Sequence, residues 1–381
     1  EIDTEDRPRI ATYNSYAGSV VRDHALRLGL PPDAVHVGEA GRFQLADAVV
    51  TGWADDIDTS YKASTLVDGV TALEGELNEH GVDPGEARET FDAIAERIEE
   101  LTPAASSDAA RAAAALRTRA QLMGLVEQFV RRKRERRLVD FGEEVRLAAR
   151  IAAVAPEVGE GERGRYRVVL LDEYQDTSIA QVELLASLFG GGHPVTAVGD
   201  PHQAIYGWRG AAAGTLFDFP TTFPRADGGA AATATLATAW RNDAGVLEAA
   251  NAVAAPLRAS AAGDVPVLRT RPGAGDGTVR GHVVETVAQE AALIADHLAD
   301  RREPGPDGRP PTAAVLCRKR SQFAPIAAAL EERGVPVQVV GLAGLLQTPE
   351  VADLWSALIV VHDPGRGDAL ARLLTGPAVN P

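Results

Sequence analysis

Short apolar runs alternate with amphipathic segments in the second half of the chain. The runs at 166–173, 193–200, 281–287, 312–318 and 335–341 predict buried strands, and the segments between them carry apolar residues at helical spacing. Strands that alternate with helices in this way are typical of a parallel sheet that is covered on both faces. The pattern therefore predicts an α/β fold.

The periodicity changes to an almost wholly helical one over residues 61–150. A Gly- and Ala-rich stretch at 225–235 predicts a linker between two α/β units. We therefore expect a first domain at 1–60 and 151–235, a helical insertion within it, and a second domain at 236–381. No internal repeat is present.

Composition limits the classes of protein that are possible. Hydrophobic residues make up 45% of the chain and charged residues 24%, which is typical of a soluble globular protein. The net charge of −16 argues against coating nucleic acid through bulk charge, although a local basic groove stays compatible with it. Cys317 is the single cysteine, which excludes an internal disulfide. No apolar run is long enough to span a bilayer and no signal peptide is evident, so we expect a cytoplasmic protein.

Adjacent acids follow the predicted strand in "VVLLDEYQDTS", where Asp172 and Glu173 come directly after the apolar run. Asp200 ends the next predicted strand, "VTAVGD". Ligands of open parallel sheets bind at the carboxyl ends of the strands. A Mg²⁺ ion is a natural partner for such carboxylates, and the second acid can activate a water molecule. The alternative is a solvated strand end without chemistry.

The loop "VGDPHQAIYGWRGA" at 198–211 follows the second of these strands. The amide of Gln203 can bond a phosphate and a water together. Trp208 beside Arg209 offers a stacking surface next to a cation, as single-stranded nucleic acid requires. A turn anchored by a core Trp is the other interpretation. Trp240 and Arg241 in "ATAWRND" form a further aromatic–arginine pair.

These segments resemble successive motifs of the UvrD/Rep-like superfamily 1 DNA helicases. The resemblance rests on "LLDEYQDTS", "AVGDPHQAIYGWRGA" and "LATAWRN", in the family's order and spacing. The N-terminal "ATYNSYAGSVV" is similar to the family's DNA-contacting segment, and 315–364 resembles the rest of its second domain. "GLAGLLQTPEVADL" and the Ala- and Arg-rich composition resemble the actinobacterial branch, which includes helicase-nucleases.

The resemblance implies two RecA-like P-loop NTPase-type domains that hold ATP and Mg²⁺ between them. Asp172 would hold the metal ion together with Glu173, and Glu173 would be the general base for the attacking water. Gln203 would sense the γ-phosphate, and Arg241 would touch it. Trp240 stands where the family usually has a Tyr on the adenine, and this substitution keeps an aromatic face.

The resemblance also implies contacts with a DNA strand, with Trp208 stacked on a base. Asn14 stands where the family commonly has a His. The residues implied in DNA binding are Thr12, Tyr13, Ser15, Tyr206, Trp208 and Arg209.

The lysines are too few and wrongly placed for a phosphate-binding loop. Lys62, Lys133 and Lys319 are the only ones, and none lies in G-x-x-x-x-G-K-[ST]. We therefore expect that loop upstream of Glu1, further motifs beyond Pro381, and no ATP turnover by the chain alone. For "RRKRERR" at 131–137, a solvated helix face is favoured over a phosphate-binding patch.

The predicted function is that of the central part of an ATP-dependent DNA helicase or translocase in DNA repair or recombination. The resemblance implies 3′-to-5′ movement on single-stranded DNA, action at junctions of single- and double-stranded DNA, and room for a second motor or a nuclease subunit as partner. The alternatives are a non-catalytic DNA-binding scaffold of the same fold, and a P-loop phosphohydrolase that acts without DNA.

Overall fold

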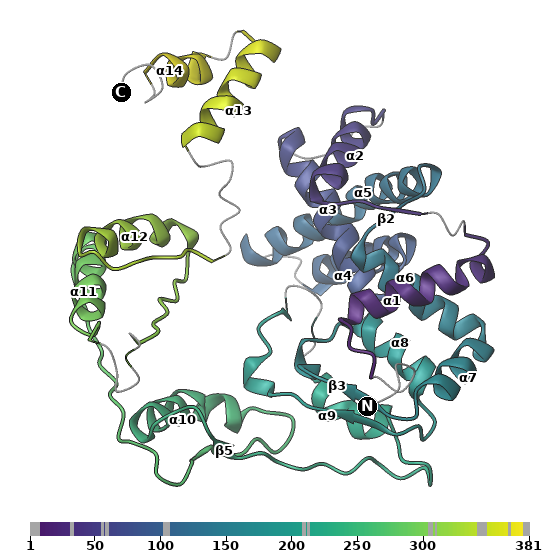
Figure 1. The fold of residues 1–381 in the computed structure, drawn as a ribbon. Coiled ribbons are helices and arrows are strands. Elements are labelled where there is room, and N and C mark those ends of the chain that lie inside the picture. The colour runs from purple at the N-terminus through teal and green to yellow at the C-terminus, as the bar shows by residue number, and fades with distance from the viewer. Residues whose placement is uncertain are drawn as a thin grey trace. The chain divides into compact units, whose positions relative to one another are not determined.

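The chain is mostly helical, with short parallel strand pairs (Figure 1). It divides into two compact units, Glu1–Val279 and Arg280–Pro381, which are described separately below. The computed structural model describes residues 8–30, 34–54, 57, 61–101, 107–207, 211, 214–303, 308, 311–340, 349–364 and 367–375.

The elements of the first unit are, in chain order, α1 (Tyr13–His24), η2 (Ala25–Leu28), β1 (Val35–His36), α2 (Glu39–Thr51), α3 (Ala63–His80), α4 (Pro84–Leu101), α5 (Ser107–Glu135), β2 (Leu138–Val139), α6 (Phe141–Val154), α7 (Pro156–Arg165), β3 (Val169–Leu171), η3 (Tyr174–Asp176), α8 (Ile179–Phe189), β4 (Val195–Ala197), η4 (Pro201–Gln203), α9 (Thr215–Thr222), β5 (Thr238–Ala239), α10 (Ala244–Ala259) and β6 (Arg269–Thr270).

One hydrophobic core of this unit lies between α1, α6, α7, α8 and β3. Strand β3 pairs with β4 in parallel, so that Val169 lies opposite Val195 and Leu171 opposite Ala197. Helix α8 begins with a capping box between Ser178 and the Gln181 side chain, which satisfies backbone groups that a helix start leaves unpaired. The core thus fixes the end of β3, where the candidate acids lie.

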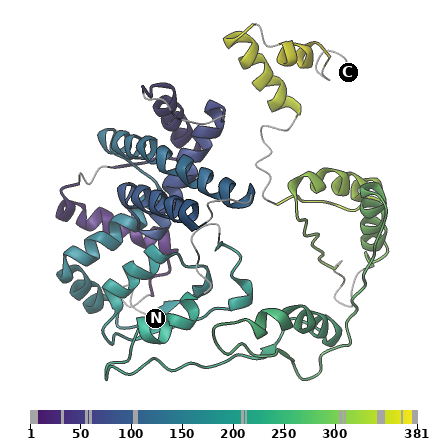
Figure 2. The same ribbon diagram turned by 180° about the vertical axis from the view of Figure 1, so that it is seen from behind.

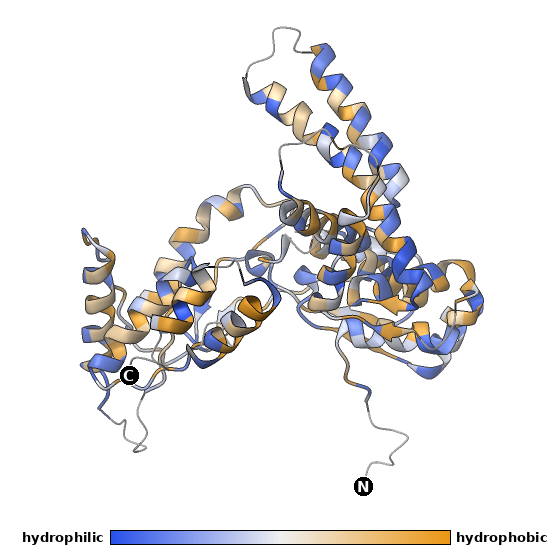
Figure 3. Cartoon of the chain, turned by 90° about the horizontal axis from the view of Figure 1, so that it is seen from above, coloured by the Kyte–Doolittle hydropathy of each residue, from blue (hydrophilic) through white to orange (hydrophobic). Residues whose placement is uncertain are grey.

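A second core lies between helices α2, α3, α4 and α5. Met123, Leu125 and Phe129 of α5 are fully buried in it, and α4 packs along α5 (Figure 2). In Figure 3 these long helices carry both hydrophobic and hydrophilic residues, as expected for helices with one buried face. Helix α2 shares this core with α3–α5, whereas α6 belongs to the first core. The domain bounds drawn from the sequence stay a prediction.

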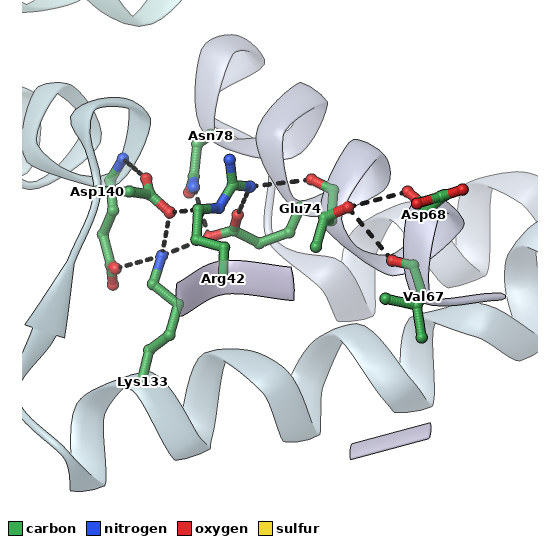
Figure 4. A network of polar contacts seen from close by, with 9 residues as sticks. Arg42, Val67, Asp68, Glu74, Asn78, Lys133 and Asp140 are labelled. Atoms are coloured by element: carbon green, nitrogen blue, oxygen red, sulfur yellow. Dashed lines mark hydrogen bonds and ion pairs between the residues drawn. The ribbon is translucent and has the colours of Figure 1, made fainter. Parts of the chain in front are cut away.

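A buried charge network joins the helices of the two cores (Figure 4). The ammonium of Lys133 on α5 lies 2.8 Å from Glu74 Oε1, 2.5 Å from Asp140 Oδ2 and 2.8 Å from Glu143 Oε2. Arg42 on α2 adds contacts of 2.7 Å to Glu74 Oε2 and 3.1 Å to Asp140 Oδ2. Three carboxylates and two cations from α2, α3, α5 and the start of α6 thus share one site.

Lys133 has no exposed surface, so the solvated helix face expected for 131–137 is wrong at this position. Burial by itself would lower the pKa of Lys133, but the charges of Glu74, Glu143 and Asp140 outweigh burial and raise it. Burial would raise the pKa of Asp140, yet Lys133 and Arg42 hold it below its ordinary value. Mutual pairing is the physical reason why these groups stay charged inside the protein.

The second unit comprises α11 (Val287–Ala299), η6 (Arg320–Gln322), α12 (Phe323–Glu332), α13 (Pro349–His362) and α14 (Gly367–Thr375). A small core forms between α11 and α12 around Ala295, Ile326 and Leu330. Within the described ranges, no helix of the chain is both long and apolar enough to cross a lipid bilayer.

The strands expected at 281–287, 312–318 and 335–341 do not form in the described residues. A strand is held by hydrogen bonds to a neighbouring strand, and these segments have no such partner there. Val283 and Leu316 are accordingly almost fully exposed. The parallel sheets expected from the sequence are therefore present in the described residues only as two-stranded pairs, namely β1–β2, β3–β4 and β5–β6.

We predict that Lys133→Met destabilises the first unit by about 3–5 kcal/mol, because the change leaves buried carboxylates short of a partner. The measurement is the shift of the chemical unfolding transition. Arg134→Met, at the exposed neighbouring position on α5, is the matched control and should change stability by less than about 0.5 kcal/mol. Equal shifts for the two variants would contradict the importance of the network.

Candidate active site

The carboxyl ends of β3 and β4 lie side by side because the two strands are parallel. The pairing continues past the strands, since the Val198 amide donates to the Leu171 carbonyl at 2.8 Å and the Tyr174 amide to the Val198 carbonyl at 2.9 Å. Asp172 and Glu173 therefore leave β3 beside the segment that leads from β4 to Asp200. This confirms the strand-end position expected from the sequence.

Glu173 adopts a left-handed backbone conformation, with φ 50° and ψ 42°. A residue with a side chain pays about 1–3 kcal/mol for such a conformation, and the surrounding structure must enforce it. Tyr174 supplies part of that constraint, because it is fully buried and its ring meets those of Phe219 and Phe223 edge-on. Strain of this kind is found at functional sites more often than elsewhere.

The two adjacent acids have different environments. One oxygen of Asp172, Oδ1, accepts from the Glu173 amide at 3.0 Å, and both residues are exposed. Glu173 Oε2 accepts from Gln175 Nε2 at 2.7 Å. Asp172 therefore keeps an oxygen available to solvent, as a water-mediated Mg²⁺ ligand needs. Across the described ranges, no three His, Cys, Asp or Glu side chains gather as a ready-made metal site.

Gln203 lies at the end of η4, next to the same strand ends. Its Nε2 donates to Asp200 Oδ2 at 2.9 Å, and Asp200 Oδ1 accepts from the His202 amide at 2.9 Å. Asp200 thereby caps the short helix and orients the Gln203 amide, whose oxygen does not take part in this bond. Gln203 is exposed, so this oxygen can meet a ligand.

Helix α1 is attached to the strand end through Tyr13, whose hydroxyl donates to the Asp172 carbonyl at 2.8 Å. Burial, with nearby Tyr174, Asp172 and Glu173, raises the pKa of Tyr13, so the hydroxyl stays protonated as a donor. Thr12 caps α1 by accepting from the Ser15 amide at 3.2 Å. The segment expected to contact DNA thus lies against the acidic strand end.

The other residues expected at the site do not join this hydrogen-bonded group at the ends of β3 and β4. Tyr206 is 37% exposed on the loop after η4, and Trp240 is 70% exposed directly after β5. In the described part of the chain, no hydrogen bond or ion pair joins Trp240 or Arg241 to Asp172, Glu173 or Gln203. Trp208 and Arg209 lie outside the described residues.

The sequence analysis missed Gln175, which links two of the predicted residues. Gln175 is almost completely buried, and its Oε1 accepts from the Asp200 amide at 3.0 Å. The signal in the sequence was a long polar residue two positions after Glu173. Only the structure shows that both ends of this amide are bonded.

Paired ends of parallel strands that carry an acid pair and a polar loop are the place where open sheets of this kind bind their ligands. The family model of the UvrD/REP helicase N-terminal domain matches residues 3–224, and that of the UvrD-like helicase C-terminal domain matches residues 234–380. The chain therefore belongs to the UvrD/REP family of DNA helicases.

Named relatives agree with this family. The chain is 29% identical to the ATP-dependent DNA helicase UvrD1 of Mycobacterium tuberculosis over 324 residues, which is 83% of this chain and 38% of that protein. It is 31% identical to UvrD2 of Mycobacterium bovis over 236 residues, 61% of this chain and 32% of that protein. Against DNA helicase II of Escherichia coli the identity is 27% over 240 residues, 63% and 32% of the two chains. The chain thus spans about a third of the length of these relatives.

We predict that Tyr13→Phe lowers the free energy of unfolding by about 0.5–1.5 kcal/mol, the usual contribution of one neutral hydrogen bond. The Tyr16 hydroxyl donates to the Glu162 carboxylate at 2.5 Å, so Tyr16→Phe should cost more, about 1.5–3 kcal/mol. Chemical unfolding measures both variants. A Tyr13→Phe protein as stable as the parent would show that the bond to the Asp172 carbonyl does not hold α1 to the strand end.

Proposed function

We propose that the full-length protein is an ATP-dependent helicase that translocates on single-stranded DNA and separates duplex strands in DNA repair or recombination. The observation that carries this proposal is the hydrogen-bonded group at the ends of β3 and β4, in which Gln175 and Asp200 connect the acid pair Asp172 and Glu173 to Gln203. A 3′-to-5′ direction and a RecA-like arrangement of two domains are parts of the same proposal, and membership of the UvrD/REP family supports them.

In this proposal Glu173 removes a proton from the water that attacks the terminal phosphate of ATP. The exposed carboxylate suits that task, since a general base must reach the water. Asp172 would hold Mg²⁺ through water, and this ion, when bound, neutralises phosphate charge. Gln203 would contact the γ-phosphate, with Trp240 and Arg241 on the nucleotide. The phosphate-binding loop would come from residues outside this sequence.

Single-stranded DNA is the proposed second ligand, including its junctions with duplex DNA. Trp208 would stack on a base, beside Tyr206 and Arg209. The DNA strand would run past the start of α1 and contact Thr12, Tyr13 and Ser15. The bond from Tyr13 to the Asp172 carbonyl supports a route between DNA and the ATP-facing acids. Further protein partners, such as a second motor or a nuclease subunit, stay a prediction.

We expect Glu173→Gln in the full-length protein to lower DNA-stimulated ATP turnover on the order of 10²-fold or more, because it removes the base but keeps the shape. Binding of a fluorescent ATP analogue should be preserved. Glu160→Gln, which changes an exposed Glu on α7, is the matched control and should leave turnover unchanged. A Glu173→Gln protein with near-normal turnover would rule out the base role, and a parent protein that binds DNA without hydrolysing ATP would favour the scaffold alternative.

For Trp208→Ala we expect single-strand DNA affinity to fall by roughly 1–3 kcal/mol, or about 5- to 150-fold, through loss of one base stack. Turnover of ATP without DNA should hardly change, because Asp172 and Glu173 are untouched. Affinity, DNA-free turnover and melting temperature are measured on one preparation. A lower melting temperature with normal affinity per folded molecule would assign Trp208 to a core instead.

A further inference from the structure

Gln175 is a buried amide that joins two polar segments of the site. It lies in η3, directly after the acid pair, with 1% of its surface exposed. Its Nε2 donates to Glu173 Oε2 at 2.7 Å, and its Oε1 accepts from the Asp200 amide at 3.0 Å. A glutamine side chain is suited to this bridge, because it carries a donor and an acceptor on one rigid planar group.

The bridge continues from Asp200 to Gln203. Asp200 receives the Gln175 bond on its backbone amide, and its Oδ2 accepts from Gln203 Nε2 at 2.9 Å. A continuous path of three hydrogen bonds therefore runs from Glu173 through Gln175 and Asp200 to Gln203. It connects the end of β3 with the loop that follows β4, independently of the pairing between the strands.

Gly199 provides independent evidence that the site is built around this amide. A Cβ at position 199 would lie 2.7 Å from Gln175 Oε1 and 3.2 Å from the Gln175 backbone nitrogen. Gly199 does not have a positive φ, so its backbone conformation does not itself require glycine. The space that a side chain would need is occupied first by the Gln175 amide and then by Leu216, whose Cδ1 would lie 3.1 Å away.

The chemistry of the bridge suits a carboxylate that must stay basic. A neutral N–H donor orients the Glu173 carboxylate without pairing it with a full positive charge, as Lys or Arg would. The donor also has a geometric task, because Glu173 is in a left-handed conformation at the end of the strand. An unrestrained carboxylate on such a turn could take several rotamers, and only some would reach the water.

We propose that Gln175 is a positioning residue that fixes the Glu173 carboxylate and couples it to the Gln203 loop. The inference rests on the proposed function, in which Glu173 is the general base and Gln203 contacts the γ-phosphate. A shift of Gln203 toward phosphate then moves Asp200, and Gln175 transmits this movement to Glu173. Gln175 itself does not touch the reacting atoms.

The test uses Gln175→Met in the full-length protein, because Met has a similar length and lacks both polar groups. We expect kcat for ATP to fall roughly 10- to 100-fold, as for other misplacements of a reacting group. The KM for ATP and the binding of a fluorescent ATP analogue should hardly change. Gly199→Ala, which pushes the amide away without altering it, should produce the same split between kcat and KM.

Gln181→Met is the matched control, because it makes the same substitution and also removes a side-chain amide that has two hydrogen bonds. Its Oε1 accepts from the Ser178 amide and its Nε2 donates to Asn14, both at 3.0 Å, and neither bond reaches Glu173 or Asp200. DNA-free turnover per folded molecule should therefore match that of the parent protein, even if the melting temperature falls. The comparison separates general destabilisation from loss of positioning.

The rate of ATP hydrolysis by a double variant decides whether Gln175 acts through Glu173. This rate is measured in single turnover with enzyme in excess. If Gln175 acts only through Glu173, adding Gln175→Met to Glu173→Gln should not slow the residual reaction further. A full additional loss, or equal effects of Gln175→Met and Gln181→Met, would overturn the positioning role while the proposed function stands. Near-normal turnover by Glu173→Gln alone would instead overturn the proposed function, and the positioning role with it.

Discussion

The buried ammonium of Lys133 is the interaction on which the arrangement of the first unit depends. It holds carboxylates from α3 and from the start of α6 at one point, and Arg42 brings α2 to the same carboxylates. Helix α6 belongs to the core that supports β3, whereas α2, α3 and α5 form the other core. Each charge is stable inside the protein only while its partners are in place. The network therefore makes the two cores interdependent.

At the ends of β3 and β4, hydrogen bonds from neutral groups likewise connect segments that are distant in the chain. Gln175 and Asp200 connect the candidate base to Gln203 through hydrogen bonds, and Tyr13 connects α1 to the carbonyl of Asp172. The segments proposed to contact DNA and ATP are thus joined to one short stretch of backbone. Such an arrangement gives a physical route by which binding of one ligand can alter the site of the other.

Long periodic segments were predictable from the sequence. The helical pattern expected over 61–150 contains α3, α4 and α5, and the apolar runs before Asp172 and Asp200 contain β3 and β4. Periodicity predicted these elements correctly because each has a partner to pack against or to pair with. Helix α4 packs against α5, its neighbour in the chain, and β3 pairs with β4. Periodicity failed at 281–287 and 312–318, where the same apolar pattern lacks a strand to pair with in the described residues.

The sequence by itself determined the family, through the order of its motifs, and the candidate acids, because charges directly after an apolar strand are conspicuous. Tertiary structure alone decided which polar residues act together. Lys133 lies in a run of basic residues that looks solvated, and Gln175 is one uncharged amide among many. Their roles depend on partners as distant in the chain as Glu74 and Asp200, and pairing across such distances is set by packing rather than by local pattern.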